Sequence, residues 1–197
     1  MRSYITDEEF CEYSRLVQKG EAYEGQFKEL IASDNYQRIS GLIDTLRERM
    51  NANDIYVAYV DVDVIRSYKG IKEGWNPILY MFDSYKDEKL RYYLGDVGPC
   101  NPDFNEDVIK FMKTGERPDN YFLSHSDYGY NTSAIMPVMF DGTTIAVIGV
   151  EIPMVTLQSA LREYVTHTVF ATIAIVLVFI IVYMTCLLYT SPSPRDS

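Results

Sequence analysis

Histidine and cysteine, the side chains that most often bind zinc or act as nucleophiles, are scarce in this sequence. The chain has 197 residues, of which two are histidines and three are cysteines. Cys11, Cys100 and Cys186 lie far apart and do not have the spacing of metal ligands. A Cys11–Cys100 disulfide outside the cytoplasm stays open as an alternative, although no local pattern supports it. We therefore predict no metal site and no cofactor.

Basic residues are too few to balance the acidic ones. Lys and Arg number 18 against 28 Asp and Glu, which gives a formal net charge of -10. The only charges after Glu163 are Arg195 and Asp196, which cancel, so the whole excess lies before the apolar C-terminal segment. A surface of this sign repels phosphate backbones, and this excludes nucleic acid from the expected partners.

The patterns of known active sites are also missing, since the sequence has no glycine-rich phosphate loop and no activated Cys or Ser. His125, Ser126 and Asp127 are adjacent, and adjacent residues on an extended chain point to opposite faces, so they cannot form a catalytic triad. Asp61 and Asp63 share one face of a strand end and could hold a cation. Because no third ligand is near, we interpret them as solvated carboxylates. We predict no catalytic residues and no enzyme in this stretch.

One long apolar segment is present. From Thr168 the sequence reads TVFATIAIVLVFIIVYMTCLLY, without a charge between His167 and Arg195. About 20 apolar residues span a bilayer core, so the segment predicts a transmembrane helix and the membrane as a partner. The N-terminal MRSYITDEEFCEYS has no apolar region typical of a signal peptide. Read literally, the two chain ends predict a tail-anchored cytoplasmic interaction protein, which we keep as the alternative.

Helical patterns come first along the chain. Thr6 followed by Glu9 is a capping box and predicts a helix that ends near Gly20. FNEDVIKFMKTGE predicts a short helix closed by Gly115. Between these, a better defined helix is predicted by apolar residues at helical spacing: Ile39, Leu42, Ile43, Leu46 and Met50.

Strand patterns follow. DIYVAYVDVDV, from Asp54, predicts a central strand and NPILYMFDS a second one, while KLRYYLGD is a shorter strand or a strand-like loop. NYFLSHS, YNTSAIMPVMF and TTIAVIGVEI predict an antiparallel meander, whose last two strands are joined by a hairpin turn at Asp141-Gly142. After Pro153 the chain turns helical and continues into the apolar segment. The predicted fold class is α+β, a single antiparallel sheet with helices packed on it.

Several of these segments resemble a known family. NDIYVAYVD, ILYMFDS, YYLGD, KTGE and DYGYNTSAIMPVMFDGTTIAVIGVEIPM are similar to the Cache type of PAS-like domain, the extracytoplasmic sensor of bacterial transmembrane receptors. The most specific part runs from Tyr128 to Ile152, with Glu151 where the family commonly carries Asp. The resemblance implies a PAS-like antiparallel sheet with N-terminal helices and a C-terminal transmembrane helix. It also implies a homodimer in the inner (plasma) membrane, with the sensor outside the cytoplasm.

In such receptors the membrane helix feeds a cytoplasmic output, such as a chemotaxis signalling region, histidine kinase, diguanylate cyclase or phosphatase. No output domain follows here, and CLLYTSPSPRD, from Cys186, resembles one translated frame of the transposase adapter used in sequencing libraries. We therefore expect that the native chain is cut near Thr185. The predicted organisation is a helical segment over 1–30, the sensor domain over 31–153, a connecting and transmembrane helix over 154–185, and an adapter-derived tail over 186–197.

Tyrosine, present 17 times, is the residue that best indicates a ligand site. Its ring and hydroxyl together suit a small polar metabolite, such as an amino acid or amine. Glu151 would be costly as an unpaired buried charge, so it either receives a ligand ammonium, as the corresponding acid does in amino-acid-binding members of the family, or caps the helix after Pro153. Trp75 belongs either to a loop over the pocket or to the edge of the core. The predicted ligand-binding residues are Tyr59, Trp75, Tyr80, Tyr92, Tyr130, Ser133 and Glu151.

Overall fold

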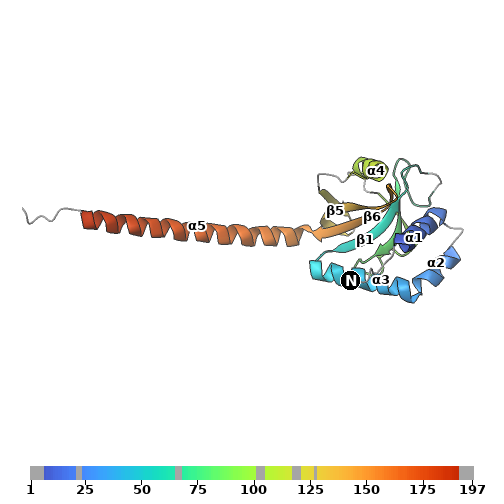
Figure 1. Ribbon diagram of the computed structural model, residues 1–197, viewed down its shortest axis with the longest axis horizontal. Helices are drawn as coiled ribbons and strands as arrows, with labels where there is room; N and C mark the ends of the chain where they lie inside the picture. Colours follow the sequence, from blue (N-terminus) through green and yellow to red (C-terminus); the bar gives the residue numbers. More distant parts are fainter. Residues whose placement is uncertain are drawn as a thin grey trace, which may run out of the picture. The chain divides into compact units, whose positions relative to one another are not determined.

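Figure 1 shows the computed structural model, which describes residues 7–20, 24–64, 68–100, 105–116, 121–126 and 128–190. The chain forms two compact units, Met1–Met154 and Val155–Ser197. The first unit contains a sheet and four helices, and the second consists of one long helix.

Three helices precede the first strand, namely α1 (Asp7–Lys19), α2 (Glu24–Ile31) and α3 (Asp34–Met50). The prediction of α1 and α3 is confirmed, although Thr6 lies outside the described residues, whereas α2 was not predicted. The side chain of Ser33 caps α3 by accepting a hydrogen bond from the Tyr36 amide (3.3 Å), and Asn51 ends the helix in the left-handed region (φ 52°).

The six strands form one antiparallel sheet in the order β3-β2-β1-β6-β5-β4. Asp141 and Gly142 both have positive φ (49° and 74°), which confirms the predicted tight hairpin. The strands are β1 (Asp54–Val60), β2 (Pro77–Asp83), β3 (Val97–Pro99), β4 (Phe122–Ser126), β5 (Gly129–Phe140) and β6 (Thr143–Pro153). The predicted α+β class, with N-terminal helices and an antiparallel sheet, is confirmed.

The segment KLRYYLGD was predicted to be either a short strand or a strand-like loop. It forms a loop, and β3 begins after it at Val97. The backbone N–H of Tyr92 donates to the Asp83 carboxylate (2.9 Å), and that of Tyr93 donates to the Asp96 carboxylate (2.7 Å). These amides therefore bond side chains instead of a neighbouring strand.

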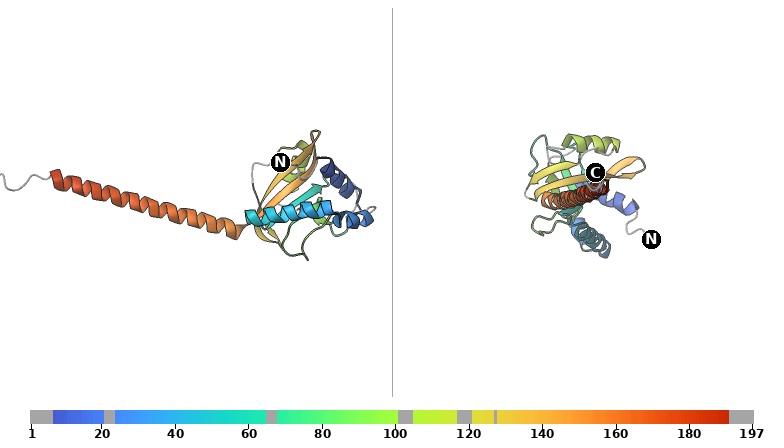
Figure 2. Two further views of the ribbon diagram at one scale, coloured as in Figure 1. Left: turned by 60° about the horizontal axis from the view of Figure 1, so that its bottom comes forward. Right: turned by 90° about the vertical axis from the view of Figure 1, so that its left-hand side faces the viewer.

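The two faces of the sheet carry separate cores. Helices α1, α2 and α3 lie on one side and α4 (Asn105–Thr114) on the other, as the right-hand view of Figure 2 shows. Val57, Leu79 and Phe82 pack in the core under α1–α3. Val60 and Val147 pack with α4 on the opposite face. We call these the three-helix face and the α4 face.

Two β-bulges change which residues share a face. The β1–β2 ladder shifts so that Val57 pairs with Phe82 but Ala58 pairs with Tyr80, which leaves Met81 as an extra residue. In the β5–β6 ladder, Val138 pairs with Ala146 but Met139 pairs with Thr144. Beyond each extra residue, the side chains of the bulged strand point to the opposite face of the sheet from the one they would otherwise occupy. The bulges therefore determine which polar side chains at the strand ends share a face.

The interpretation of Asp61 as a solvated carboxylate is wrong, whereas Asp63 is exposed as expected. Asp61 is buried, and its carboxylate accepts a hydrogen bond from the Tyr68 hydroxyl (2.6 Å). The structure also shows Cys11 and Cys100 as buried cysteines that form no disulfide, with Cys100 in the core under α4. The alternative of a disulfide between them is therefore not realised.

The second unit is formed by α5 (Met154–Thr190). The segment Met154–Tyr189 is long and apolar enough to cross a membrane, with a mean hydropathy of 2.8 in its most apolar window. Its large apolar side chains are exposed, including Leu157, Leu161 and Val165. The helix also continues past Thr185, so the adapter origin of 186–197 stays a prediction from the codons.

Gly149 of β6 is a position where a methyl group has no room. A Cβ there would overlap the ring of buried Tyr56, so we expect Gly149→Ala to lower the free energy of unfolding by about 1–3 kcal/mol. Gly41→Ala in α3, where nothing lies within 4 Å, is the matched control and should raise it by about 0.5–1 kcal/mol. Denaturant unfolding of the full chain in detergent measures both, and equal stability of Gly149→Ala and the wild type would contradict this packing.

Candidate functional site

Three carboxylates meet at one end of the α4 face. Asp54 begins β1, Asp83 ends β2, and Glu151 lies near the end of β6. Asp54 and Glu151 are direct cross-strand partners, while Asp83 pairs with Tyr56, the next residue of β1 on the same face. Like charges in such positions destabilise a sheet. We call Asp54, Asp83 and Glu151 the carboxylate cluster.

Asp54 and Asp83 share a proton, and their hydrogen bonds show where it resides. Asp83 accepts from the backbone N–H groups of Tyr85 (2.6 Å) and Tyr92 (2.9 Å), which stabilise its charged form. Asp54 Oδ1 accepts from the N–H and hydroxyl of Ser84 (both 3.2 Å). Burial, followed by the charge of Asp83, raises the pKa of Asp54 to about 8. Asp54 therefore carries the proton near neutral pH, and Asp83 carries the charge.

Glu151 is held by amides from neighbouring segments. Its Oε2 accepts from Asn131 Nδ2 (3.1 Å), and Asn131 Oδ1 accepts from Asn53 Nδ2 (3.3 Å). Burial raises the pKa of Glu151, and the nearby Ser133 hydroxyl and Asn131 amide oppose this increase. The side chain is thus fixed at the sheet end in a polar but poorly solvated position.

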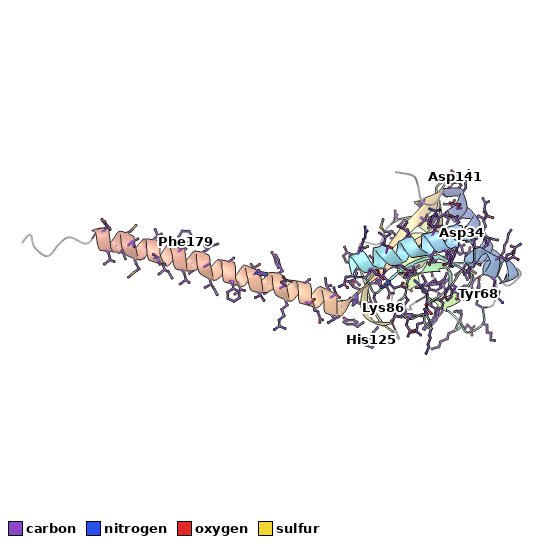
Figure 3. The ribbon with its side chains drawn as sticks, turned by 90° about the horizontal axis from the view of Figure 1, so that it is seen from below. Asp34, Tyr68, Lys86, His125, Asp141 and Phe179 are labelled. Atoms are coloured by element: carbon purple, nitrogen blue, oxygen red, sulfur yellow. The ribbon has the colours of Figure 1, made fainter. Side chains whose placement is uncertain are left out.

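No lysine, arginine or histidine of the described chain forms an ion pair with the cluster. Burial raises the pKa of Asp83, and its hydrogen bonds and the charge of Arg91 oppose this increase, but the Arg91 guanidinium pairs with Asp44 of α3. Lys86 follows the site in sequence and is labelled in Figure 3, yet its side chain is exposed. A buried cluster of this charge without a cationic partner is costly for folding.

Tyrosine rings pack around the cluster. Tyr80 stacks on Tyr92 (ring centroids 4.1 Å apart) and meets Tyr56 edge to face (5.8 Å). Tyr128 contacts Tyr85 edge to face (4.8 Å) and lies 6.5 Å from Tyr92. Burial raises the pKa of Tyr56 and Tyr80, so both remain neutral and present a hydroxyl group. The site combines carboxylates with aromatic faces, and both attract organic cations.

Two buried hydroxyl groups beside the cluster lack a hydrogen-bond partner among the described residues. Ser133, 1% exposed, lies opposite Glu151 in the β5–β6 ladder, but its Oγ does not reach the carboxylate in hydrogen-bonding geometry. Ser124, 5% exposed, lies opposite Asn131 in the β4–β5 ladder. A buried polar atom without a partner is unfavourable and indicates a missing contact.

Four of the predicted ligand-binding residues come together here, and three do not. Tyr80, Tyr92, Ser133 and Glu151 surround the site. Tyr59, Trp75 and Tyr130 lie elsewhere.

Each of the three excluded residues has a simple structural reason. Tyr59 is partly buried and pairs with Leu79, which lies in the core of the three-helix face, whereas buried Tyr56 pairs with Asp83 and is the tyrosine that β1 contributes to the site. Trp75 lies in the β1–β2 connection, under Lys72 Nζ (5.1 Å from the ring). Figure 3 shows that Tyr68 of this connection lies away from His125 and Lys86, at the other end of the sheet. Tyr130 is 44% exposed and pairs with His125.

Sequence reasoning missed Asp54, Asp83 and Asn131. Acidic and amide residues at strand ends are usual in turns, and nothing local distinguishes these three from Asp61 or Asp63. Asn131 lies inside β5 and is buried, which its neighbours in sequence do not reveal. The only signal in the sequence was that Asp54, Tyr56 and Ala58 are two residues apart and so lie on the same face of one strand.

No family model matches this chain, and no curated protein matches it. Among solved structures, the ligand-binding domain of the Campylobacter jejuni chemoreceptor Tlp3 in complex with 4-methylisoleucine is similar, with 18% identity, a TM-score of 0.38, and coverage of 75% of this chain and 51% of that chain. The complex with L-norvaline has 19% identity, a TM-score of 0.36, and coverage of 75% and 51%. A hypothetical protein from S. aureus has 12% identity, a TM-score of 0.34, and coverage of 59% and 93%.

This chain thus spans about half the length of the chemoreceptor structures that it matches. Those structures are ligand-binding or sensory domains of a chemoreceptor. At these identities and TM-scores the similarity assigns no ligand or activity to this chain.

The shared proton gives stability a pH dependence. The pKa of Asp54 rises from 3.8 to about 8 on folding, so between these values the folded state keeps a proton that the unfolded state has lost. The free energy of unfolding should therefore fall as pH rises from about 5 to about 8, by up to about 1.4 kcal/mol per pH unit.

Asp54→Asn removes this proton and should flatten the slope, as measured by urea unfolding at several pH values. Asp63→Asn, which removes an exposed carboxylate beyond the other end of β1, is the control and should keep the wild-type slope. A slope that persists unchanged in Asp54→Asn would show that Asp54 is not the proton carrier.

Proposed function

We propose that residues 31–153 form an extracytoplasmic sensor for a small molecule that carries an ammonium group. The observation that supports this function is the carboxylate cluster, in which Asp54 and Asp83 are buried and Glu151 is partly buried, and which has no ion pair within the described chain. Isolated buried charges are tolerated when they serve a site, because structural burial alone would favour apolar side chains.

An ammonium group supplies what the cluster lacks. It carries a positive charge and donates several hydrogen bonds, which match the carboxylates of Asp83 and Glu151 and the hydroxyl oxygen of Ser133. The faces of Tyr80, Tyr92 and Tyr128 would add cation–π attraction. The contacts are non-covalent, so the site is suited to reversible binding rather than to catalysis.

The signal would leave the domain through α5. Glu151 lies in β6, and α5 begins at Met154 directly after this strand ends. A ligand that binds one arrangement of β6 more tightly would shift the domain toward it, and the helix would transmit the displacement. We infer that α5 crosses the plasma membrane, that the receptor acts as a homodimer, and that its output domain is encoded beyond residue 185.

Ligand-dependent stabilisation tests the proposed sensor. The full chain in detergent is screened by thermal shift against amino acids, amines, organic acids and purines. At about 100 times its Kd a ligand adds about 2.7 kcal/mol, which raises Tm by about 5–10 °C. We expect the stabilising compounds to carry an ammonium group.

The variants Glu151→Gln and Glu12→Gln complete this experiment. Glu151→Gln keeps the size of the side chain but removes its charge, and it should reduce the shift. Glu12 is exposed on α1, so Glu12→Gln should respond as the wild type does. Stabilisation by organic acids alone, or an undiminished shift in Glu151→Gln, would contradict the proposed site.

The gene sequence on both sides of this chain tests the receptor architecture. We expect a second hydrophobic helix upstream and, downstream, a basic segment followed by an output domain, because positive charge marks the cytoplasmic side of a membrane helix. A genomic read across both ends supplies the measurement. Native stop codons at both ends would instead support the tail-anchored interaction protein.

A further inference from the structure

The charges of the carboxylate cluster restrict the ligand beyond the requirement for one ammonium group. We propose that the ligand is an organic dication without a carboxylate, such as a linear diamine, and that its binding expels the proton shared by Asp54 and Asp83 into solvent. This inference rests on the proposed function, since it concerns the ligand of the same site.

Arg91, the cation that acts on Asp83, pairs through its Nη2 with Asp44 of α3 on the three-helix face, rather than with a group of the cluster. An α-amino acid would place its own carboxylate beside Asp54, Asp83 and Glu151, where like charges repel. The described groups around the cluster that could donate a hydrogen bond to a ligand carboxylate are neutral amides and hydroxyls. Arg91 is paired with Asp44, and the Asn131 amide already donates to Glu151. A ligand without a carboxylate avoids this repulsion.

The cluster has two separate anchoring points for cationic groups. One is the Asp54–Asp83 pair of β1 and β2, and the other is Glu151, with Ser133 opposite it on β5. No group of three or more His, Cys, Asp or Glu residues in the described ranges is close enough to hold one metal ion. Three carboxylates on neighbouring strands carry more negative charge than one ammonium group balances, so a ligand with two ammonium groups balances the cluster better than a ligand with one.

The unpartnered hydroxyl of Ser133 is the observation, independent of the acidic residues, that points to a ligand at this place. Ser133 is 1% exposed, and its side chain lies on the α4 face opposite Glu151. An ammonium bound to Glu151 would donate a hydrogen bond to Ser133 Oγ and give this buried atom the partner that it lacks. The second ammonium would then reach Asp83 and Asp54.

Proton release follows from the charge balance. Without ligand, Asp54 holds a proton that reduces its repulsion with Asp83 and Glu151. An ammonium beside the pair stabilises two carboxylates, so Asp54–COOH ionises to Asp54–COO⁻ and the proton leaves to solvent. The groups that face Asp54 are Asp83 and Tyr80 of β2, Ser84 after it, Glu151 of β6, Tyr56 of β1, and Tyr85 and Tyr128 of the adjacent connections. Arg91 acts on Asp83.

Isothermal titration of the full chain in detergent near pH 7 tests the inference with four probes: putrescine, butylamine, ornithine and lysine. Putrescine carries two ammonium groups, butylamine carries one, and ornithine is putrescine with a carboxylate added. We expect putrescine to bind at least tenfold more tightly than each of the other three. Titration in phosphate and in Tris, which differ in ionisation enthalpy, should show release of about one proton per putrescine bound.

Two variants assign the effects to residues. Asp54→Asn should abolish the difference between the two buffers while retaining some binding of putrescine. Glu151→Gln should remove the preference for putrescine over butylamine, because it removes the second anchoring charge. Glu12→Gln on α1 is the control for both, and circular dichroism confirms that each variant is folded.

The outcomes separate this inference from the proposed function. If ornithine or lysine binds more tightly than putrescine, the site senses an ammonium group but the ligand class proposed here is wrong. If putrescine gives the same heat in both buffers, proton release is wrong. If no amine and no amino acid binds to the folded chain, the proposed function fails together with this inference.

Discussion

The surrounding structure depends on one constraint, which is the burial of Asp54 and Asp83 beside partly buried Glu151 at one end of an antiparallel sheet. Each charge needs hydrogen-bond donors or a proton, and the chain supplies both within a few residues. The segment after β2 remains a loop because its amides at Tyr85 and Tyr92 turn toward Asp83. The amide of Asn131 is directed at Glu151 in the same way. Local structure here follows from electrostatics rather than from strand propensity.

The two faces of the sheet divide stability and recognition between them. The three-helix face is closed by apolar side chains of α1 and α3 against β1 and β2, such as Val17, Ile39 and Phe82. The α4 face is apolar near Val60, Phe111 and Val147 but polar toward the strand ends. A sheet anchored on one side by packing tolerates unfavourable burial on the other, and this is the usual balance at functional sites.

Much of the fold follows from the sequence, and less of the site does. Runs of β-branched and aromatic residues and the Asp141-Gly142 turn predict the strands, because both signals are local. Helix α2 is too short to show a clear helical repeat of apolar residues. In α3, Leu46 and Met50 are exposed, although their helical spacing predicts that they face the core. Choosing Tyr59 instead of Tyr56 shows the limit for the site: both lie in β1, and only packing reveals which face each occupies. The β1–β2 bulge places Asp83 at the site, and no sequence pattern predicts this bulge.

The bulge at Val138 and Met139 also has a consequence for folding specificity. If β5 and β6 paired from the hairpin without the extra residue, Ser133 would lie opposite Val150 instead of Glu151. The side chains of Ser133 and Asn131 would then enter the apolar core beneath α1 and α3, without partners for their polar atoms. That misaligned state is therefore penalised by the same polar residues that form the site. The side chains proposed to recognise a ligand therefore also disfavour the misaligned pairing of the strands that carry them.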